Sequence, residues 1–498
     1  MYGFVRVAFL IALGSLLVTA VRADDVRRPV EPGDDLAKLA AEAPPGTVFM
    51  LAPGIYRVAN IVAKDRQVFD GNGQAVISGA VQVADFHSDG SVWRAQGPAP
   101  LALSHGGCDP KRWTAPADGC LYRESLYADG WLIPRVFALA DVKGDTWFQS
   151  RPDGGVVIGF DPAHRSIEIS HAETAFMGAA TGVVLRGLII EKFTPIAQHA
   201  AVQVYASSGW TIENSVVRDN SGAGVRTGNA MRLIGNRVLN NGQIGIEGSG
   251  NDIVLDGNEI AFNNSHGFSP AWEAGGTKFV ATNNLLAERN CVHHNAGPGL
   301  WTDIDNRAST FTDNVVAYNE GVGIFHEISG AAMIVGNLSV ANGSQEDSPW
   351  ASQILVSGSI DTEVRGNRVV VARDYGHGIF VVEEGRPNDS KVVDSGPTYA
   401  SRGNSITGNE IRFLGDHGIY GFHAQGPLEP SLLRTRNRFA ANTIIAGDDR
   451  PRFADDGPRV DLKTEMTRGQ EIGSRLLIVT GVELAGGSLS PPPGCKFD

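Results

Sequence analysis

Residues 311–325 read FTDNVVAYNEGVGIF, and residues 253–263 (IVLDGNEIAFN) and 333–343 (MIVGNLSVANG) repeat the same pattern. In each stretch a short apolar run leads to an asparagine, a second apolar run follows, and Asn and Gly mark the next corner. The asparagines that follow the first run form an array: Asn214, Asn236, Asn258, Asn290, Asn314, Asn337, Asn367, Asn409 and Asn442. Their spacings are 22, 22, 32, 24, 23, 30, 42 and 33 residues, so the unit is 22 to 24 residues and the longer gaps contain insertions.

This unit predicts three short strands per coil, with Asn and Gly at the corners. Both residues tolerate the left-handed backbone that a sharp corner needs, and stacked Asn side chains can hydrogen-bond along a column. A leucine-rich repeat would carry a dense Leu consensus, which the array lacks, and a propeller blade would be about twice as long. We therefore predict an all-β fold, a right-handed parallel β-helix solenoid over residues 181–445.

The chain begins with a predicted export signal, residues 1–23. Arg6 precedes an apolar run, and small residues precede a cleavage point after Ala23. The run of about 14 apolar residues is too short to span a bilayer comfortably. The mature protein is therefore expected to be secreted or periplasmic, with no membrane insertion after cleavage.

Three further segments flank or interrupt the repeats. Residues 24–80 are expected to form an N-terminal cap with one helix, Asp35 to Ala43, capped by Asp34, followed by the first coils. Residues 81–180 break the repeat rhythm and are predicted to be an inserted, mainly antiparallel β subdomain; a set of decorating loops is the alternative. Residues 446–498 form a C-terminal tail with no functional signal.

Charge and cysteines limit the partners and the compartment. The net charge of −13 argues against nucleic acid or an anionic membrane surface as a partner. In an oxidising compartment Cys108 and Cys120 would close a short disulfide loop. Cys291 falls at an interior-type repeat position and is expected to be a buried free thiol, whereas the partner of Cys495 cannot be assigned.

The Asn-Gly corner repeats resemble the bacterial parallel β-helix repeat family, to which pectate lyases, polygalacturonases and alginate lyases are structurally related. Residues 44–58 (PPGTVFMLAPGIYRV) are similar to the N-terminal cap of that group, and residues 125–136 (SLYADGWLIPRV) resemble an inserted β module of some members. The resemblance covers residues 34–445 and implies the fold. It implies no single reaction, because the family includes lyases, hydrolases, epimerases and adhesins, and Gly376-His377-Gly378 stands without the other polygalacturonase motifs.

Carboxylates and large aromatics gather in residues 272–329, which contain WEAGGTK, GPGLWTDIDN and GVGIFHEIS. Counting from Asn290 and Asn314 aligns Asp303 with Glu327, and strand alternation points both outward on adjacent strands about 5 Å apart. The same count from Asn258 places Glu273 beside Asp305, with Lys278 nearby. Four carboxylates would then share one outward face.

Like charges on adjacent strands need compensation, and three explanations are open. A carboxyl pair about 5 Å apart suits a retaining glycosidase, and crowding would keep one acid protonated. A hard cation such as Ca²⁺ could be bound by Glu273, Asp303, Asp305 and Glu327. Pairing with local cations such as Lys278 or Arg307 would be purely structural.

An aromatic column is the second candidate feature. Trp301 and Phe325 are expected one above the other on the outward face, with Phe380 and Tyr420 continuing the column. Exposed rings would stack on sugar faces, or loops such as the insertion after Asn337 would cover them. His326 is expected to point inward as a hydrogen-bonded core residue.

We therefore predict an exported carbohydrate-active protein, favouring a glycoside hydrolase that acts on a polysaccharide or oligosaccharide and requires no cofactor. Asp303 and Glu327 would form the catalytic pair, in unassigned order, and Asp305 and Glu273 would tune or bind. The expected substrate contacts are Trp301, Phe325, Lys278, Trp272 and Tyr420. The alternatives are a Ca²⁺-dependent uronate lyase or epimerase with Lys278 as base, and a non-catalytic surface or carbohydrate-binding protein.

Overall fold

The computed structural model describes residues 26–344, 347–425, 430–455, 459–479 and 495. The predicted signal, residues 1–23, lies outside the described residues. No helix in the described ranges is long and apolar enough to cross a membrane.

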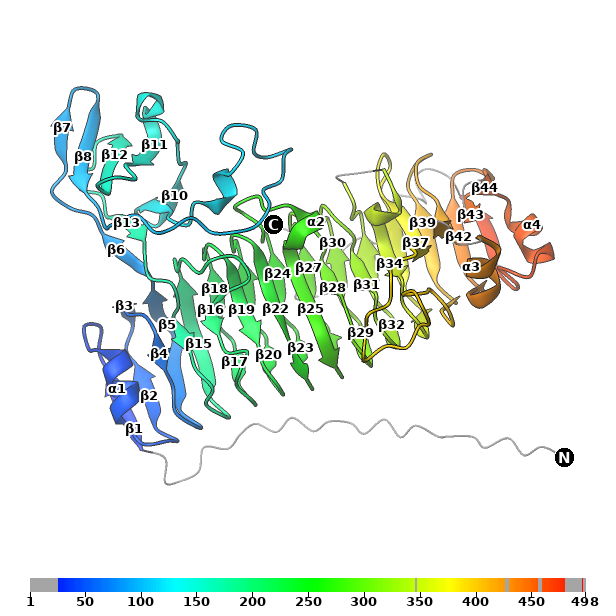
Figure 1. Cartoon of the computed structure of the whole chain (residues 1–498), viewed down its shortest axis with the longest axis horizontal. Helices are drawn as coiled ribbons and strands as arrows, with labels where there is room; N and C mark the ends of the chain where they lie inside the picture. Colours follow the sequence, from blue (N-terminus) through cyan, green and yellow to red (C-terminus); the bar gives the residue numbers. More distant parts are fainter. Residues whose placement is uncertain (1–25, 345–346, 426–429, 456–458, 480–494, 496–498) are drawn as a thin grey trace.

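The body of the molecule is a rod of stacked coils, a parallel β-helix as predicted (Figure 1). One 13-stranded sheet lines one side of the rod. Its strands are β4 (Ile61–Val62), β14 (Phe176–Met177), β16 (Ala200–Gln203), β19 (Ala223–Thr227), β22 (Ile244–Asn251), β25 (Gly275–Asn283), β28 (Leu300–Thr302), β31 (Ile324–Glu327), β34 (Ser352–Ser357), β37 (His377–Glu383), β40 (Tyr420–Ala424), β43 (Phe453–Asp455) and β44 (Arg459–Val460).

A 24-stranded sheet forms the other two sides of each coil and pairs each strand with its equivalent in the next coil. Its strands are β1 (Arg27–Val30), β2 (Val48–Leu51), β3 (Gly54–Arg57), β5 (Val68–Ser78), β15 (Val184–Glu191), β17 (Thr211–Glu213), β18 (Val216–Arg218), β20 (Arg232–Ile234), β21 (Arg237–Leu239), β23 (Val254–Asp256), β24 (Glu259–Ala261), β26 (Leu286–Glu288), β27 (Cys291–His293), β29 (Ser309–Thr312), β30 (Val315–Ala317), β32 (Ala332–Val335), β33 (Leu338–Val340), β35 (Thr362–Arg365), β36 (Arg368–Val371), β38 (Ser405–Thr407), β39 (Glu410–Phe413), β41 (Arg438–Ala440), β42 (Thr443–Ala446) and β45 (Arg475–Ile478). Because β45 pairs with β42, the helix extends past the predicted end at residue 445.

Asparagine ladders hold the corners of the coils together, as the stacked pattern predicts. The Nδ2 of Asn290 donates to Oδ1 of Asn314 at 2.9 Å, and Asn314 donates in the same way to Asn337. A second ladder runs through the other asparagine of each unit, for example from Asn295 to Asn319 at 2.8 Å. These bonds satisfy buried amides that would otherwise destabilise the fold.

The structure differs from the predicted corners in two details. The left-handed backbone belongs to the residue before the ladder asparagine, such as Asp313 with a φ of 55° and Gly336 with a φ of 69°. Asn214 itself lies one residue early, and Ser215 takes the ladder position by donating its backbone N–H to Oδ1 of Asn236.

The inserted subdomain consists of two antiparallel sheets, which stand above the N-terminal coils in Figure 1. One contains β6 (Ala80–Gln82), β9 (Leu126–Ala128), β10 (Trp131–Ile133) and β13 (Ile167–Ser170); the other contains β7 (His87–Asp89), β8 (Val92–Gln96), β11 (Gly144–Gln149) and β12 (Gly155–Gly159). Its Cys108–Cys120 disulfide, predicted from the sequence, packs with Phe268 and Trp272 near α2 (Pro270–Glu273). The inserted segment therefore supports a loop of the helix more than 100 residues away in sequence.

The remaining helices lie at the two ends of the rod. They are α1 (Leu36–Glu42), α3 (Pro430–Arg436) and α4 (Leu462–Thr467). The expected cap of α1 was off by one residue, because Asp35 rather than Asp34 accepts a hydrogen bond from the Lys38 N–H.

The expectation of a free thiol at Cys291 is wrong. Cys291 forms a disulfide with Cys495, 204 residues away, beside Val315. No periodic signal connects a tail residue to a repeat position, so the sequence could not reveal this pair. The bond fixes Cys495 to the middle of the rod.

Candidate functional site

The candidate site lies on the outer face of the 13-stranded sheet, where β25, β28 and β31 stack. Trp301 pairs with Phe325 on adjacent strands, and Thr302 pairs with Phe279. This register places Lys278, Trp301 and Phe325 in one outward column. Asp303 follows β28 directly, and Glu327 ends β31, two residues further along each strand than the ring column.

A pocket of about 270 Å³ opens over these residues. Its floor includes Lys278, Trp301, Asp303, Phe325 and Glu327. Three segments outside the strands form its walls: α2 with Trp272, the insertion after Asn337 with Trp350, and the loop after β37 with Arg386. The structure therefore brings together five of the nine residues predicted for catalysis and binding on the floor, and a sixth, Trp272, in the wall.

Asp303 combines a buried ion pair with an unpaired oxygen. Its Oδ2 lies 3.0 Å from the Nζ of Lys278, and both side chains are only 9% exposed. Its Oδ1 is buried and has no hydrogen-bond partner among the described residues. Burial raises the pKa of Asp303, although the neighbouring Lys278 charge lowers it. An unpaired buried carboxylate oxygen is costly and marks a position where a ligand can be bound.

Glu327 is also buried and also contacts a cation. Trp301 Nε1 donates to its Oε2 at 3.1 Å, and Arg386 contacts its Oε1 at 3.0 Å. Burial and the nearby Asp303 charge raise the pKa of Glu327 to about 8, against the opposing effect of Arg386. Glu327 therefore holds a proton near neutral pH, next to a carboxylate that is paired with a lysine.

A third acid, Glu247, extends the charged column and was missed from the sequence. It pairs with Lys278 across β22 and β25, and its Oε1 is buried without a hydrogen bond in the described part of the chain. Burial and the charge of Glu273 raise the pKa of Glu247 to about 8. The signal was present, because Glu247 lies 11 residues after Asn236, as Trp301 lies 11 after Asn290.

Asp305 is not part of the pocket. The backbone leaves the strand at Ile304 and Asp305, whose φ angles are 57° and 61°. Asp305 consequently turns toward the loop after β37, where it accepts hydrogen bonds from Ser390 and, at 3.4 Å, from Tyr399. Strand alternation would point Ile304 into the core of the β-helix, but because of this left-handed backbone Ile304 is 44% exposed.

Glu273 is also placed differently from the expectation. The insertion in its coil comes before β25, so Glu273 ends α2 and does not lie beside Asp305. Its Oε2 accepts a hydrogen bond from Gln198 Nε2 at 2.6 Å, although its charge still acts on Asp303 and Glu247. The four-carboxylate set proposed for Ca²⁺ is therefore not assembled, because Glu273 and Asp305 bond elsewhere.

The aromatic column is covered rather than exposed. Leu355 and Phe380 continue it beyond Phe325, and Trp350 packs against it. Trp301 is 6% exposed, and its ring stacks on Phe325 at a centroid distance of 5.5 Å. The insertion after Asn337 thus provides the cover, leaving the edges of both rings in the pocket.

The structure confirms the expected inward position of His326 but not the expected outward position of Tyr420. His326 points inward, as expected, with hydrogen bonds to Thr302 at 2.8 Å and to the Gly330 carbonyl at 2.7 Å. Tyr420 was wrongly assigned to the outward column, because Gly421 is the residue that pairs with Phe380. Tyr420 is 2% exposed and belongs to the core, so it does not contact a substrate in this pocket.

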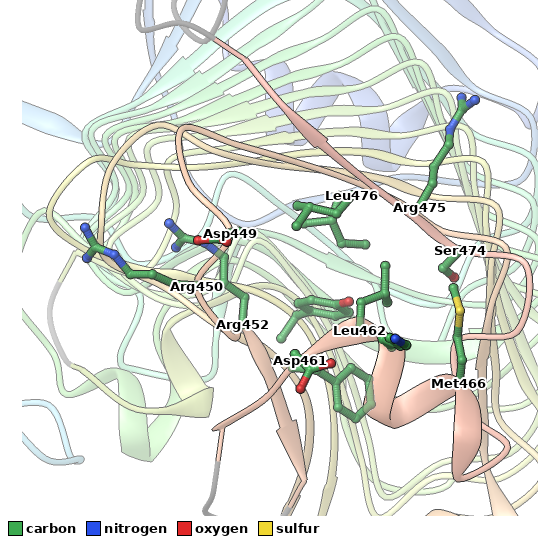
Figure 2. Close-up of a pocket in the computed structure, with 13 residues that line it drawn as sticks. Asp449, Arg450, Arg452, Asp461, Leu462, Met466, Ser474, Arg475 and Leu476 are labelled. Carbon is green, nitrogen blue, oxygen red and sulfur yellow. The ribbon is translucent and has the colours of Figure 1, made fainter.

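A larger cavity of about 360 Å³ lies at the C-terminal end of the rod (Figure 2). It is lined by the core side chains Tyr420, Ile444 and Phe453 and by the partly buried side chains of Leu462, Met466 and Leu476. In Figure 2 the side chains of Arg450 and Arg475 extend away from its centre. This cavity is the end of the hydrophobic core, and the smaller pocket has the converging acids and cations.

Comparisons with known proteins agree with the architecture. The family described as "Right handed beta helix region" matches residues 200–369. No curated protein matches the sequence.

Several solved structures are similar to the chain. A complex of XylC with xylose has a TM-score of 0.62 and 16% identity, covering 82% of this chain and 80% of that chain. DFA-IIIase from Arthrobacter chlorophenolicus A6 has a TM-score of 0.44 and 13% identity, covering 91% and 99% of the two chains. The A-module of the mannuronan C-5 epimerase AlgE6 from Azotobacter vinelandii has a TM-score of 0.38 and 14% identity, covering 89% and 93%. The chain has a right-handed parallel β-helix fold.

Proposed function

We propose that the protein is a carbohydrate-active enzyme, a glycoside hydrolase that uses Glu327 as general acid and Asp303 as nucleophile. One observation carries the proposal: two buried carboxyl groups line one pocket, each beside a cation, and the pKa of Glu327 is raised to about 8. Lys278 favours the ionised form of Asp303, whereas burial and the Asp303 charge keep a proton on Glu327. Glycosidases require such a division between two neighbouring acids.

The spacing of the strands supports a retaining mechanism. Asp303 and Glu327 come from adjacent parallel strands, whose backbones lie about 4.8 Å apart. Retaining enzymes have carboxyl groups about 5 to 5.5 Å apart, whereas inverting enzymes need a wider gap for water. Glu327 would donate its proton to the glycosidic oxygen as Asp303 attacks the anomeric carbon, and water would then release the sugar from Asp303.

The pocket walls suit a sugar. Trp272, Trp301 and Trp350 line the space, and indole rings pack well against the apolar faces of sugar rings. The fold similarity to XylC, whose structure contains xylose, adds support at the level of the scaffold. Lys278 and Arg386 provide hydrogen-bond donors beside the acids.

A second candidate activity is lysis or epimerisation of a uronate-containing polysaccharide. The supporting observation is that two cations, Lys278 and Arg386, flank the acids in the pocket. Arg386 would neutralise a substrate carboxylate, and Lys278, in its neutral form, would act as base. Of the acids proposed as Ca²⁺ ligands, only Asp303 and Glu327 would remain available to a cation in this pocket.

The test is product analysis on a panel of neutral and uronate-containing polysaccharides. The hydrolase releases new reducing ends without ultraviolet-absorbing unsaturated product; the lyase releases both; an epimerase changes the uronate composition without cleavage. Asp303→Asn and Glu327→Gln should abolish the product, and Asp305→Asn, a neighbouring acid that faces another loop, should keep it. Absence of any product would refute the enzyme assignment and leave a binding protein, whereas full activity in Asp303→Asn would refute the role of Asp303 as nucleophile.

A further inference from the structure

A second cluster of polar side chains lies outside the candidate site, at the corner that precedes β37 and β40. It consists of Asp347, His377 and His417, from three different coils. His377 belongs to the Gly376-His377-Gly378 motif, which the proposed reaction does not use. Each residue offers one ligand atom, and these atoms all lie within 4.8 Å of one another.

The distances fit a metal better than a simple ion pair. The Nε2 atoms of His377 and His417 lie 3.3 and 3.4 Å from the same oxygen, Oδ1 of Asp347. In a tetrahedral Zn²⁺ site with bonds of about 2.0 to 2.1 Å, neighbouring ligand atoms are about 3.3 to 3.4 Å apart. Two histidines and one carboxylate are also a common ligand set for Zn²⁺.

The orientation of His417 provides a separate observation. Its Nε2 is buried and makes no hydrogen bond within the described part of the chain, although a carboxylate oxygen lies 3.4 Å away. Its ring stacks against that of His377 at a centroid distance of 5.4 Å. A buried ring nitrogen held toward a carboxylate without hydrogen-bond geometry is explained if both atoms bind a common ion.

We propose that Asp347, His377 and His417 bind a divalent transition-metal ion, with Zn²⁺ as the best-fitting ion. In the metal-free chain the Ile419 N–H lies 3.4 Å from His377 Nδ1, which places the His377 proton on Nε2. Metal binding at Nε2 therefore requires this proton to move to Nδ1, which lengthens the Ile419 contact.

The ion would connect loops that cover the aromatic column. Asp347 lies three residues before Trp350, and His417 lies two residues before Ile419. Trp350 and Ile419 both pack against the cluster that contains Trp301 and Phe325, and Trp350 also lines the candidate pocket. The metal is therefore a structural clamp on one wall of that pocket, and the inference does not depend on the proposed reaction.

The test is calorimetric titration of the full-length mature protein, without a histidine tag and after chelator treatment, with ZnCl₂. We expect one Zn²⁺ per chain, and at least a 100-fold weaker affinity in His377→Gln and His417→Gln. His87→Gln, at an exposed histidine of the inserted subdomain, is the matched control and should bind like the unmodified chain. Circular dichroism and thermal unfolding would establish that each variant is folded.

Two further readouts distinguish this site from adventitious binding. Co²⁺ should produce the visible absorption of a four-coordinate site, and Zn²⁺ should change the tryptophan fluorescence of the parent but not of Trp350→Phe. Zn²⁺ should also raise the unfolding temperature of the parent and of His87→Gln, but not of His417→Gln. Absence of saturable binding, or unchanged binding in folded His377→Gln and His417→Gln, would overturn the proposal.

Discussion

Two buried lysines, Lys192 and Lys278, each lie over an aromatic ring at the centre of a charged cluster, but the acids of the two clusters differ. Lys192 lies over the ring of Tyr127 at 4.7 Å, and Lys278 lies over Trp301 at 4.1 Å. Lys192 is the centre of a junction cluster, which joins the inserted subdomain to the coils and comprises Arg57, Glu168, Glu191, Lys192 and Arg218. Lys278 is the centre of the pocket cluster, which comprises Glu247, Lys278, Asp303, Glu327 and Arg386.

The acids of the two clusters differ in how completely they are paired. In the junction cluster Glu168 receives hydrogen bonds from both Lys192 and Arg57. Burial alone raises its pKa, but these two partners outweigh burial, and the pKa of Glu168 is lowered. In the pocket cluster the pKa values of Asp303, Glu327 and Glu247 are all raised. Asp303 and Glu247 each keep an oxygen without a hydrogen bond in the described part of the chain, and Glu327, although Trp301 and Arg386 contact it, keeps its proton. Complete pairing of ionised groups indicates a structural role, whereas incomplete pairing or a retained proton indicates a functional site.

The largest expected effect separates the two clusters by function. Glu327→Gln should lower kcat about 1,000-fold, because a general acid contributes about 100- to 10,000-fold. Its unfolding temperature should stay unchanged or rise, because a neutral amide replaces a carboxyl that already carries a proton. Kinetics on whichever polysaccharide of the panel yields product, and calorimetry, would measure both quantities.

Glu168→Gln is the matched change in the junction cluster. It should keep kcat but lower the free energy of unfolding by about 3 kcal/mol, because Lys192 and Arg57 lose a buried partner. If Glu168→Gln lost activity and kept stability, the assignment of the two clusters would be reversed.

Replacing the central lysines should have the next largest effect. Lys278→Met should lower kcat/KM at pH 6 roughly 10- to 100-fold, because loss of the cation raises the pKa of Asp303 further and keeps it protonated. The acid limb of the pH profile should therefore move to higher pH. Lys192→Met should destabilise the fold and leave the pH profile unchanged; a shifted profile in that variant would contradict the comparison.

The pH dependence of the unmodified chain should be bell-shaped. Activity needs Asp303 ionised and Glu327 protonated, so kcat/KM should rise as Asp303 loses its proton. It should then fall about tenfold per pH unit above the Glu327 pKa of about 8. An activity that stays constant from pH 7 to pH 10 would show that no protonated acid is required.

The smallest expected effect is on stability. Glu247 keeps its proton in the folded chain up to pH about 8, whereas the unfolded carboxyl loses it near pH 4.5. The folded state binds more protons in this range, so stability falls as pH rises from about 4.5 and is lowest above 8. Glu247→Gln should remove this dependence and be about 1 to 3 kcal/mol more stable than the parent at pH 9, with little difference at pH 4. Denaturant unfolding at both pH values measures this, and equal differences at the two pH values would contradict it.

The repeat period was sufficient to predict the parallel β-helix and the alignment of Trp301 with Phe325, because equivalent residues of adjacent coils stay in register between insertions. It also placed Asp303 and Glu327 on the same outward face. Asp305 could not be placed, because Ile304 and Asp305 adopt a left-handed backbone that these residue types do not signal.

Insertions limited the rest of the site prediction. Nothing in the sequence shows whether nine extra residues precede or follow a strand, so Glu273 was placed beside Asp305. Arg386 and Trp350 belong to irregular loops without a period, and only tertiary packing brings them to the pocket. Glu247 could have been found, since it occupies the same repeat position as Trp301.

A measurement of the protonation state of Glu327 tests most directly whether this residue can act as the general acid. Incorporation of glutamate labelled with ¹³C at the carboxyl carbon allows the side-chain resonances to be followed from pH 4 to pH 10. Comparison with Glu327→Gln and Glu247→Gln assigns the two buried carboxyls. We expect the Glu327 resonance to titrate near pH 8; a midpoint below pH 5 would show that Glu327 is ionised at neutral pH and is not the general acid.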